Sequence, residues 1–335
     1  MNDKRRPRGY RPSSRVKQTL DDWRRPAPVR TLIDGLGFLG SVLAVTVALA
    51  LALREGWLWV LLIWPIAAVL VARQLRAVEL IVHDASHTNL FPDHPVLNDA
   101  LADVLFAAPV AQRTRAYWRK HRVHHSDFGS SRDPCLARMT HLNGAPAGLT
   151  RLIRYMRDYW TTVGQDAASL AAFVAWHGVV GGLTGLAAGA LFGIAPATWL
   201  AAWMLGWIVP FLVTLPMLRM VAEREEHDYA GRSEFSSTVS NLGVWHRALF
   251  HPWHDGHHLL HHLFPRVPQS RHSAMHRSLD GIDPAYRKSL RRTEPLGPVA
   301  NLTAVNEEDA RNDRHQGPRA TPGDAPDART GTAAA

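Results

Sequence analysis

Residues 56–87 read GWLWVLLIWPIAAVLVARQLRAVELIVHDASH, a stretch that combines a long apolar run with two histidines. The run over 56–72 holds no charged residue. A helix needs roughly 17 to 25 apolar residues to cross the hydrocarbon core of a bilayer. Arg73 and Arg76 follow the run, and His83 and His87 come further along. The stretch therefore predicts a membrane span with histidines beyond one of its ends.

Three more apolar runs of similar length occur at 31–53, 167–194 and 197–218. Only residues 54–55 separate the first run from the second, and only residues 195–196 separate the third from the fourth. Connections this short join antiparallel neighbours. We therefore expect an all-α integral membrane protein with four spans in two hairpins, and a helical cap that holds a histidine-rich dimetal site.

The charged residues predict the orientation of these spans. Lys and Arg outnumber Asp and Glu by 38 to 29, and ten of the basic residues precede position 31. The others near the apolar runs lie mostly at the same ends: Arg73, Arg76, Arg151, Arg154, Arg157 and Arg219. This pattern is typical of membrane proteins rather than nucleic-acid-binding modules, and basic residues stay on the cytoplasmic side. We expect both termini and the active site in the cytoplasm, at a bacterial cytoplasmic membrane.

The regions outside the spans divide into three parts. Residues 1–28 predict a flexible basic arm, residues 29–293 the membrane domain, and residues 294–335 a disordered tail with little apolar periodicity. Within the domain, 149–160 has apolar residues at helical spacing and arginines off that face, which is typical of an interfacial helix. Cys135 is the single cysteine, so a metal would need nitrogen and oxygen ligands.

Eight histidines fall in three groups with helical spacing: His83 and His87; His121, His124 and His125; His258, His261 and His262. Spacings of three and four residues place side chains on one helix face. All three groups lie on the predicted cytoplasmic side, which favours a metal site over separate surface histidines. Imidazole suits zinc, copper, iron and nickel. Because one zinc ion needs only three or four protein ligands, eight histidines indicate two ions, with iron the choice for O2 chemistry.

The third group has two alternative registers, because residues 254–262 read HDGHHLLHH. Asp255 and Gly256 disfavour a helix through the earlier triplet, whereas Leu259 and Leu260 favour one through the later triplet. The later triplet, His258, His261 and His262, is therefore the expected ligand set.

The segments HDASHTNLF, YWRKHRVHHSD and HHLLHHLFPRVP together resemble the membrane fatty acid desaturase family, over about 76–271. Three histidine boxes, HxxxH, HxxHH and HxxHH, characterise that family. The resemblance implies two iron ions, O2 as co-substrate, an acyl substrate in the membrane lipid, and electrons from a separate ferredoxin-type donor. It also implies a ninth ligand after the fourth span, which here is His227.

Four further residues are candidates for positioning the ligands. Glu79 lies one turn before His83, although an ion pair with Arg76 explains it equally well; Asp84, Glu223 and His257 are the others. Some relatives have Asn at the position of Glu223, so Glu223 could bind iron, hold a water or orient His227. We expect Glu225 and Glu226 to be solvated surface charges. Asp133 has no interpretable spacing.

The three boxes leave the reaction open. Desaturation of a fatty acyl chain is the first interpretation. A hydroxylase or ketolase on the same scaffold, acting on a lipid or a specialised metabolite, is the second. A metal transporter is a third, but transport requires ionisable ligands within the spans, and these spans are almost free of them.

Overall fold

The computed structural model describes residues 6–136, 138, 148–164 and 166–301. Four of its helices are long and apolar enough to cross a membrane. They are α2 (Pro28–Glu55), α3 (Trp57–Ser86), α8 (Ala167–Phe192) and the helix Pro196–Glu226. The last is a continuous series of α9 (Pro196–Trp203), η3 (Met204–Ile208), η4 (Pro210–Thr214) and α10 (Leu215–Glu226). The four predicted spans are therefore present, and these helices fit an integral membrane protein.

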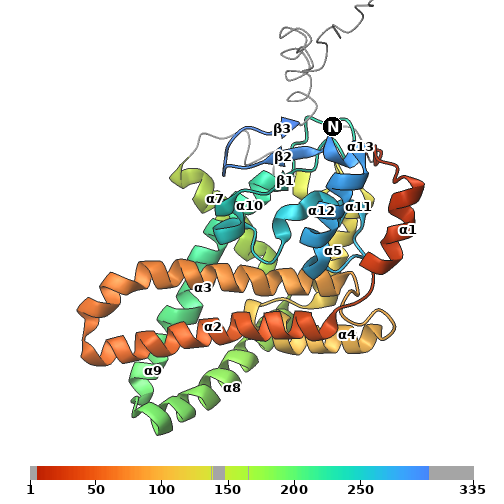
Figure 1. Cartoon of the computed structure of the whole chain (residues 1–335). Helices are drawn as coiled ribbons and strands as arrows, with labels where there is room; N and C mark the ends of the chain where they lie inside the picture. The colour runs from red at the N-terminus through yellow and green to blue at the C-terminus, as the bar shows by residue number, and fades with distance from the viewer. Residues whose placement is uncertain (1–5, 137, 139–147, 165, 302–335) are drawn as a thin grey trace, which may run out of the picture.

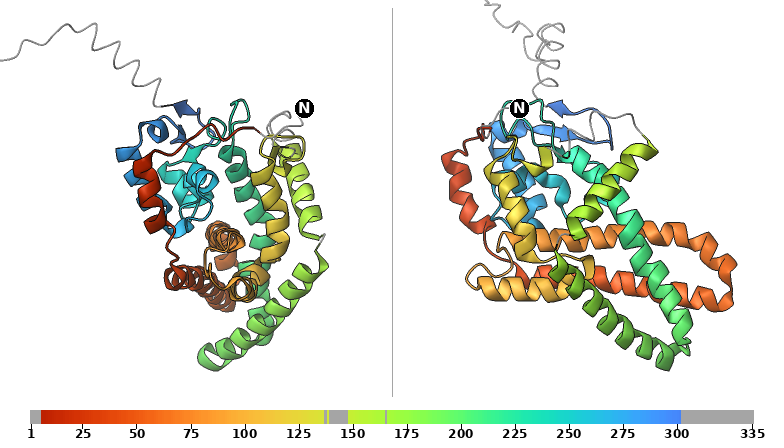
Figure 2. Two further views of the ribbon diagram at one scale, coloured as in Figure 1. Left: turned by 90° about the vertical axis from the view of Figure 1, so that its right-hand side faces the viewer. Right: turned by 180° about the vertical axis from the view of Figure 1, so that it is seen from behind.

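The long helices pack closely where small residues meet. In Figures 1 and 2, α2 and α3 lie side by side, and Gly56 alone joins them. A Cβ atom on Gly206 would lie 2.6 Å from Thr46 Oγ1, so glycine allows η3 to approach α2. The outer faces stay apolar: Leu58, Leu61 and Leu186 are each more than 60% exposed. Such a continuous apolar surface marks a contact with lipid.

The second span runs further than the apolar pattern indicated. The apolar run ends at Ala72, but helix α3 continues to Ser86, and its last three turns are almost entirely buried. Buried residues there pack on the elements that follow the span, so tertiary contacts stabilise this polar extension. This extension carries the first histidine pair into the cap.

The cap, drawn at the top of Figure 1, is built from short elements. Its helices include α5 (Thr114–Ser126), α11 (His258–Leu263), α12 (His272–Ile282) and α13 (Pro284–Arg287). Short turns of helix complete it: η5 (His246–Phe250), η6 (Asp255–His257) and η7 (Gln269–Arg271). The helix α4 (Pro95–Ala102) and the turns η1 (Asp103–Ala107) and η2 (Ala108–Val110) lie instead beside the long helices, and Figure 1 draws α4 at the level of α2. The amphipathic pattern at 149–160 corresponds to α7 (Leu149–Gly164).

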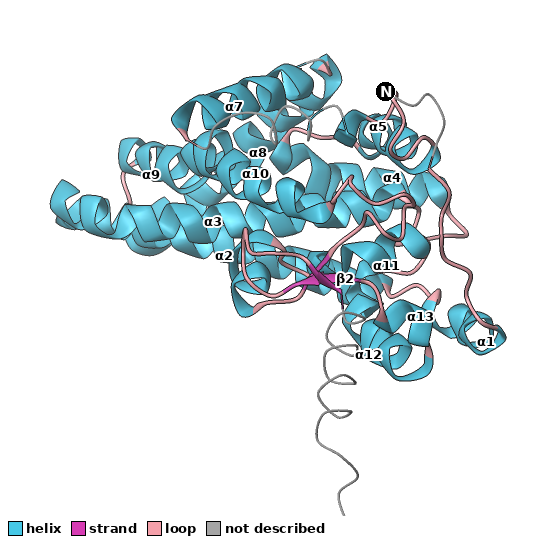
Figure 3. Cartoon of the chain, turned by 90° about the horizontal axis from the view of Figure 1, so that it is seen from above, coloured by secondary structure: helices cyan, strands magenta, loops and turns pink. Residues whose placement is uncertain are grey.

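A small sheet departs from the all-α expectation. Strands β1 (Ser240–Asn241), β2 (Leu290–Arg292) and β3 (Ala300–Asn301) are visible as the strand region of Figure 3. β1 and β2 are parallel, with Ser240 opposite Arg291, and β2 and β3 are antiparallel. Too few residues take part for a period-two pattern to appear in the sequence.

The N-terminal arm also differs from the expectation of flexibility. Residues 14–23 form α1 (Ser14–Trp23), whose Val16 and Leu20 are buried in a cluster with Met275 and Leu279 of α12. Tyr10 donates a hydrogen bond of 2.5 Å to Asp283. The arm is ordered because a few apolar residues among its charges dock on the cap. Residues 1–5 of the predicted arm and 302–335 of the predicted tail lie outside the described residues.

Candidate metal centre

Four elements carry the nine histidines into the cap. His83 lies in the last turn of α3 and His87 is its C-terminal cap, so helical spacing directs both rings to one side. His227 caps the end of α10 in an extended conformation. The boxes HRVHH and HLLHH lie on α5 and α11, respectively.

Five ring nitrogens converge in a first group. The Nε2 atom of His121 lies 2.8 Å from that of His83, 3.0 Å from that of His87, 3.0 Å from that of His125 and 3.2 Å from that of His261. His261 Nε2 also lies 2.9 Å from both His83 Nε2 and His125 Nε2. Residues from α3, α5 and α11 therefore share one centre.

Four other histidines form a second group, His124, His227, His258 and His262, and all four are buried. His124 Nε2 lies 3.2 Å from His262 Nε2, and His258 Nε2 lies 3.1 Å from His227 Nε2. His125 stands between the groups, because one of its ring nitrogens also lies within 4.8 Å of ligand atoms of His262 and Glu234.

These separations suit metal ions. Metal–imidazole bonds of about 2.1 Å place nitrogens at right angles around an ion about 3.0 Å apart. Neutral imidazole is the form that binds metals. Burial lowers the pKa of His261 and His262 well below the ordinary value, and that of His258 to about 3. Several buried lone pairs facing one another repel unless a cation lies between them, so the donor set fits two transition-metal ions.

Carboxylates bind two of these rings at Nδ1, the nitrogen that faces away from the centre. His124 Nδ1 donates to Asp133 Oδ1 at 2.8 Å, and His262 Nδ1 donates to Glu234 Oε1 at 2.9 Å. His227 Nδ1 donates to Thr238 Oγ1 at 3.4 Å. A proton on Nδ1 leaves the Nε2 lone pair free for a metal. Burial lowers the pKa of His124, but Cys135 and the hydrogen bond to Asp133 outweigh burial and raise it well above the ordinary value.

Glu234 and Thr238 are not among the residues that the sequence predicted, and Asp133 had no interpretable spacing there. Asp133 contacts His124, nine residues earlier, and Glu234 contacts His262, 28 residues later, from a segment without regular structure. Neither separation is a helical spacing, so local pattern held no signal for these contacts. The buried loop that brings Glu234 to α11 is a tertiary feature.

The four residues predicted to position ligands lie near the centre, but their described polar partners are other groups. Glu79 accepts from Gln112, Tyr159 and Arg219, and Asp84 accepts from Asn89 and the backbone of Gln269. Glu223 accepts from Arg138 at 2.6 Å and from Arg219 at 2.7 Å. Arginines therefore engage both oxygens of Glu223, which leaves its proposed role toward His227 without a contact in the described residues.

Two acidic residues that were expected at the surface are buried or nearly buried. Glu225 is 1% exposed and lies against His246, and the side chain of Glu226 is 12% exposed, with an oxygen 3.8 Å from His258 Nε2. Helix α10 ends inside the cap rather than at its surface, so all of its faces meet other elements. The expectation of solvated surface charges is wrong for both residues.

The structure also bears on the register of HDGHHLLHH. Helix α11 begins at His258, whereas His254 adopts a left-handed conformation with φ of 68°. His254 Nδ1 lies 2.7 Å and His257 Nε2 3.0 Å from Ser273 Oγ. These two histidines face α12, and the later triplet faces the nitrogen groups.

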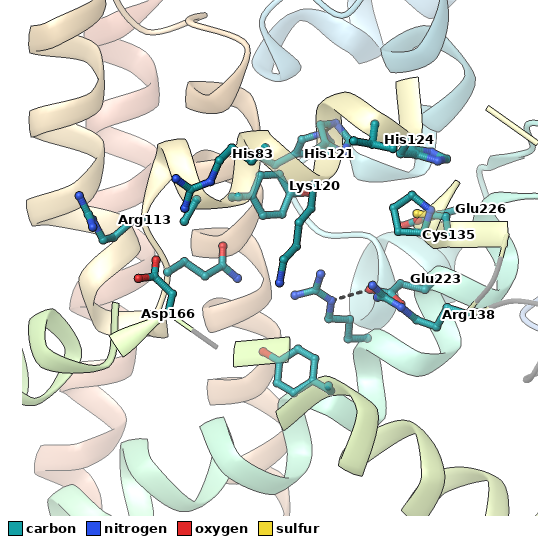
Figure 4. A pocket seen from close by; sticks show the side chains of 18 of the residues that line it. His83, Arg113, Lys120, His121, His124, Cys135, Arg138, Asp166, Glu223 and Glu226 are labelled. Carbon is teal, nitrogen blue, oxygen red and sulfur yellow. Dashed lines mark hydrogen bonds and ion pairs between the residues drawn. The ribbon is translucent and has the colours of Figure 1, made fainter. Parts of the chain in front are cut away.

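A cavity of about 550 Å³ adjoins both groups of histidines. Figure 4 shows His83, His121 and His124 along one side, with Lys120, Arg113 and Arg138 projecting toward the same space. Its lining combines apolar side chains, such as Ala116, Val123 and Pro134, with basic residues that outnumber the acidic ones. The cavity offers a substrate direct access to the candidate metal centre.

A comparison with protein-family models identifies the scaffold. The model described as "Fatty acid desaturase" matches residues 55–294, which include all nine histidines. The chain belongs to the fatty acid desaturase family. The comparison with curated proteins finds no match.

Family membership and the geometry of the histidine groups both indicate a metal-dependent oxidoreductase. Members of the fatty acid desaturase family are oxidoreductases that typically use iron, and the histidine groups of this chain could hold metal ions. The matched region begins at the end of α2 and closes after β2, so the described cap and three of the four long helices lie within it.

Proposed function

We propose that this desaturase-family protein carries out di-iron, O2-dependent desaturation of a fatty acyl chain at the membrane. The observation that supports this most directly is the convergence of nine histidines into groups of five and four beside one cavity. The ligand set proposed for one ion is His83, His87, His121, His125 and His261; the set for the other is His124, His227, His258 and His262.

The bound iron pair supplies the O2-dependent removal of hydrogen from an unactivated C–H bond. The chain itself holds and orients the ligands. Asp133 and Glu234 keep the Nδ1 protons of His124 and His262 in place, so both rings present Nε2 inward. The four histidines of the second group are buried, which limits their contact with bulk water.

The cavity suits an acyl substrate with an anionic head or carrier. Apolar groups such as Val123 and Pro134 can contact methylene groups, while Arg113, Arg119 and Lys120 supply positive charge. A long chain could enter from the lipid that surrounds the four long helices, since the first group of histidines lies just beyond the end of α3.

Electrons would come from a separate donor of the ferredoxin type. Neither a haem-binding motif nor a Gly-rich dinucleotide fingerprint occurs in the sequence. The basic residues expected on the cytoplasmic side would attract an acidic donor. In this proposal the termini, the cap and the donor would lie on one side of the membrane.

The test is product analysis. The protein is expressed together with a ferredoxin reducing system, and lipid and acid extracts are compared by mass spectrometry with those from a His261→Ala variant. We expect an acyl product that lacks two hydrogen atoms and appears only with the wild type. A product that instead gains one oxygen atom would overturn desaturation in favour of hydroxylation.

A further inference from the structure

A second buried cluster of possible ligands lies outside the nine histidines. It consists of Glu225 in the last turn of α10, His246 at the start of η5 and His251 at its end. Their exposed fractions are 1%, 0% and 0%, respectively. The site described above uses none of these three residues.

The ligand atoms of this cluster face one another at short distances. Glu225 Oε2 lies 3.0 Å from His246 Nδ1 and 3.7 Å from His251 Nε2, and all three atoms lie within 4.8 Å of one another. Among the described residues, Oε2, both His246 nitrogens and His251 Nε2 lack a hydrogen-bond partner of acceptable geometry. Unpaired buried polar atoms are costly, and their gathering at one point calls for an explanation.

The tautomer of His251 follows from its other contact. His251 Nδ1 lies 3.1 Å from Asp255 Oδ2, and Asp255 also accepts from Arg76 at 3.0 Å. An ionised carboxylate can only accept, so Nδ1 carries a proton. Burial lowers the pKa of His251, but the contacts with Asp255 and Glu225 outweigh burial and raise it to about 9. Nε2 therefore faces the carboxylate of Glu225 with a cation between them, either a proton or a metal ion.

The remaining contacts of Glu225 hold it in position. Its other oxygen, Oε1, accepts from the backbone N–H of Leu296. Its carbonyl oxygen accepts from Asn241 Nδ2 at 3.0 Å and from Arg292 at 3.0 Å. Oε2 is therefore the one oxygen of this carboxylate that points to the two histidines without a partner.

We propose that Glu225, His246 and His251 form a third metal site, for a divalent transition-metal ion such as zinc. Two imidazoles and a carboxylate are a donor set that zinc accepts, and bonds of about 2.1 Å give ligand separations close to those between Glu225 and the histidines. The contact of His251 with Asp255 is the carboxylate–histidine arrangement that orients metal ligands. The ion would tie the end of α10, two residues before His227, to the segment that leads into α11.

Metal content measured by mass spectrometry tests this proposal on full-length protein purified in detergent with Zn²⁺ and iron supplied. The variants are Glu225→Gln, which keeps an acceptor for Leu296, and His246→Phe, which keeps a ring but removes the nitrogens. His276→Phe is the matched control, because His276 Nδ1 contacts the Tyr286 hydroxyl outside the cluster. Circular dichroism establishes that each variant is folded.

We expect the wild type and His276→Phe to hold one more metal ion per chain than Glu225→Gln and His246→Phe, with unchanged iron in all four proteins. Equal metal content in the wild type and both cluster variants would overturn the proposal and would assign the site to a proton shared between histidine and carboxylate. The comparison concerns a difference between variants, so it remains decisive even if the nine histidines bind ions other than iron.

Discussion

His124 and His125 are neighbours in the chain, yet they serve different groups of nitrogens. Successive residues of a helix point about 100° apart, so α5 directs His121 and His125 toward one group and His124 toward the other. Helix α11 divides in the same way, with His261 in the first group and His258 and His262 in the second. Each HxxHH box therefore contributes to both candidate ion sites, and loss of one box should disturb both.

The ninth histidine allows a direct test at this scale. His227→Ala removes one of four nitrogens from the second group, so we expect the purified protein to lose about half of its iron. His257→Ala should keep its iron, because His257 lies beside Ser273 and His276 instead. Iron per chain, measured by mass spectrometry, checks both, with His261→Ala as the reference for ligand loss. Full iron in His227→Ala together with loss in His257→Ala would reverse the assignment.

At the scale of elements, one glycine positions the third box. A Cβ atom on Gly256 would lie 2.1 Å from the carbonyl oxygen of Asn241 in β1. The turn η6 therefore approaches the strand more closely than it could with any residue other than glycine at this position. This contact places the start of α11 beside the end of α10. The glycine that disfavours an α-helix through the earlier triplet of histidines is thus also the residue that lets α11 reach the centre.

Gly256→Ala should therefore destabilise the protein. Overpacking of this kind costs about 1–3 kcal/mol, which lowers the unfolding temperature by several degrees. Gly281→Ala in α12 is the matched control, because no atom lies within 4 Å of its added Cβ. For this variant we expect the free energy of unfolding to rise by up to about 1 kcal/mol, because alanine favours a helix more than glycine does. Thermal unfolding in detergent, followed by circular dichroism, measures both. Equal unfolding temperatures for the two variants would contradict the close approach.

At the scale of the whole molecule, the length of α3 relates the membrane to the candidate centre. Its 30 residues extend about 45 Å, whereas the hydrocarbon core is about 30 Å thick. The last turns must therefore project beyond the lipid, and these are the turns that carry Arg76, Glu79 and His83. The cap, with all nine histidines, lies at this end of the spans.

Reporter fusions test the side of the membrane on which the cap lies. A fluorescent protein fused after Ala335 should fluoresce, because the positive-inside pattern places this end in the cytoplasm. Alkaline phosphatase inserted between Glu55 and Gly56 should be active, since this connection lies at the opposite ends of α2 and α3. Insertion at Gly193 should give the same phosphatase signal. Phosphatase activity from a fusion after Ala335 would contradict the predicted orientation.

Local patterns in the sequence were enough to predict the long helices and the candidate ligands. Apolar length predicts a span because every residue of such a helix meets lipid or another apolar helix, wherever the rest of the chain lies. Spacings of three and four residues group histidines on one helix face, and Asp255 and Gly256 disfavour the earlier register. The family also follows from these short motifs, and the match over residues 55–294 confirms it.

Only the tertiary structure decided how these parts meet. The division of the histidines into groups of five and four depends on three helices and the end of α10, which come together from positions 83 to 262. Asp133, Glu234 and Glu225 gain their roles from partners at non-helical distances along the chain, and α1 is ordered because it docks on α12. Periodicity describes which face a side chain occupies, whereas long-range packing determines what that face meets.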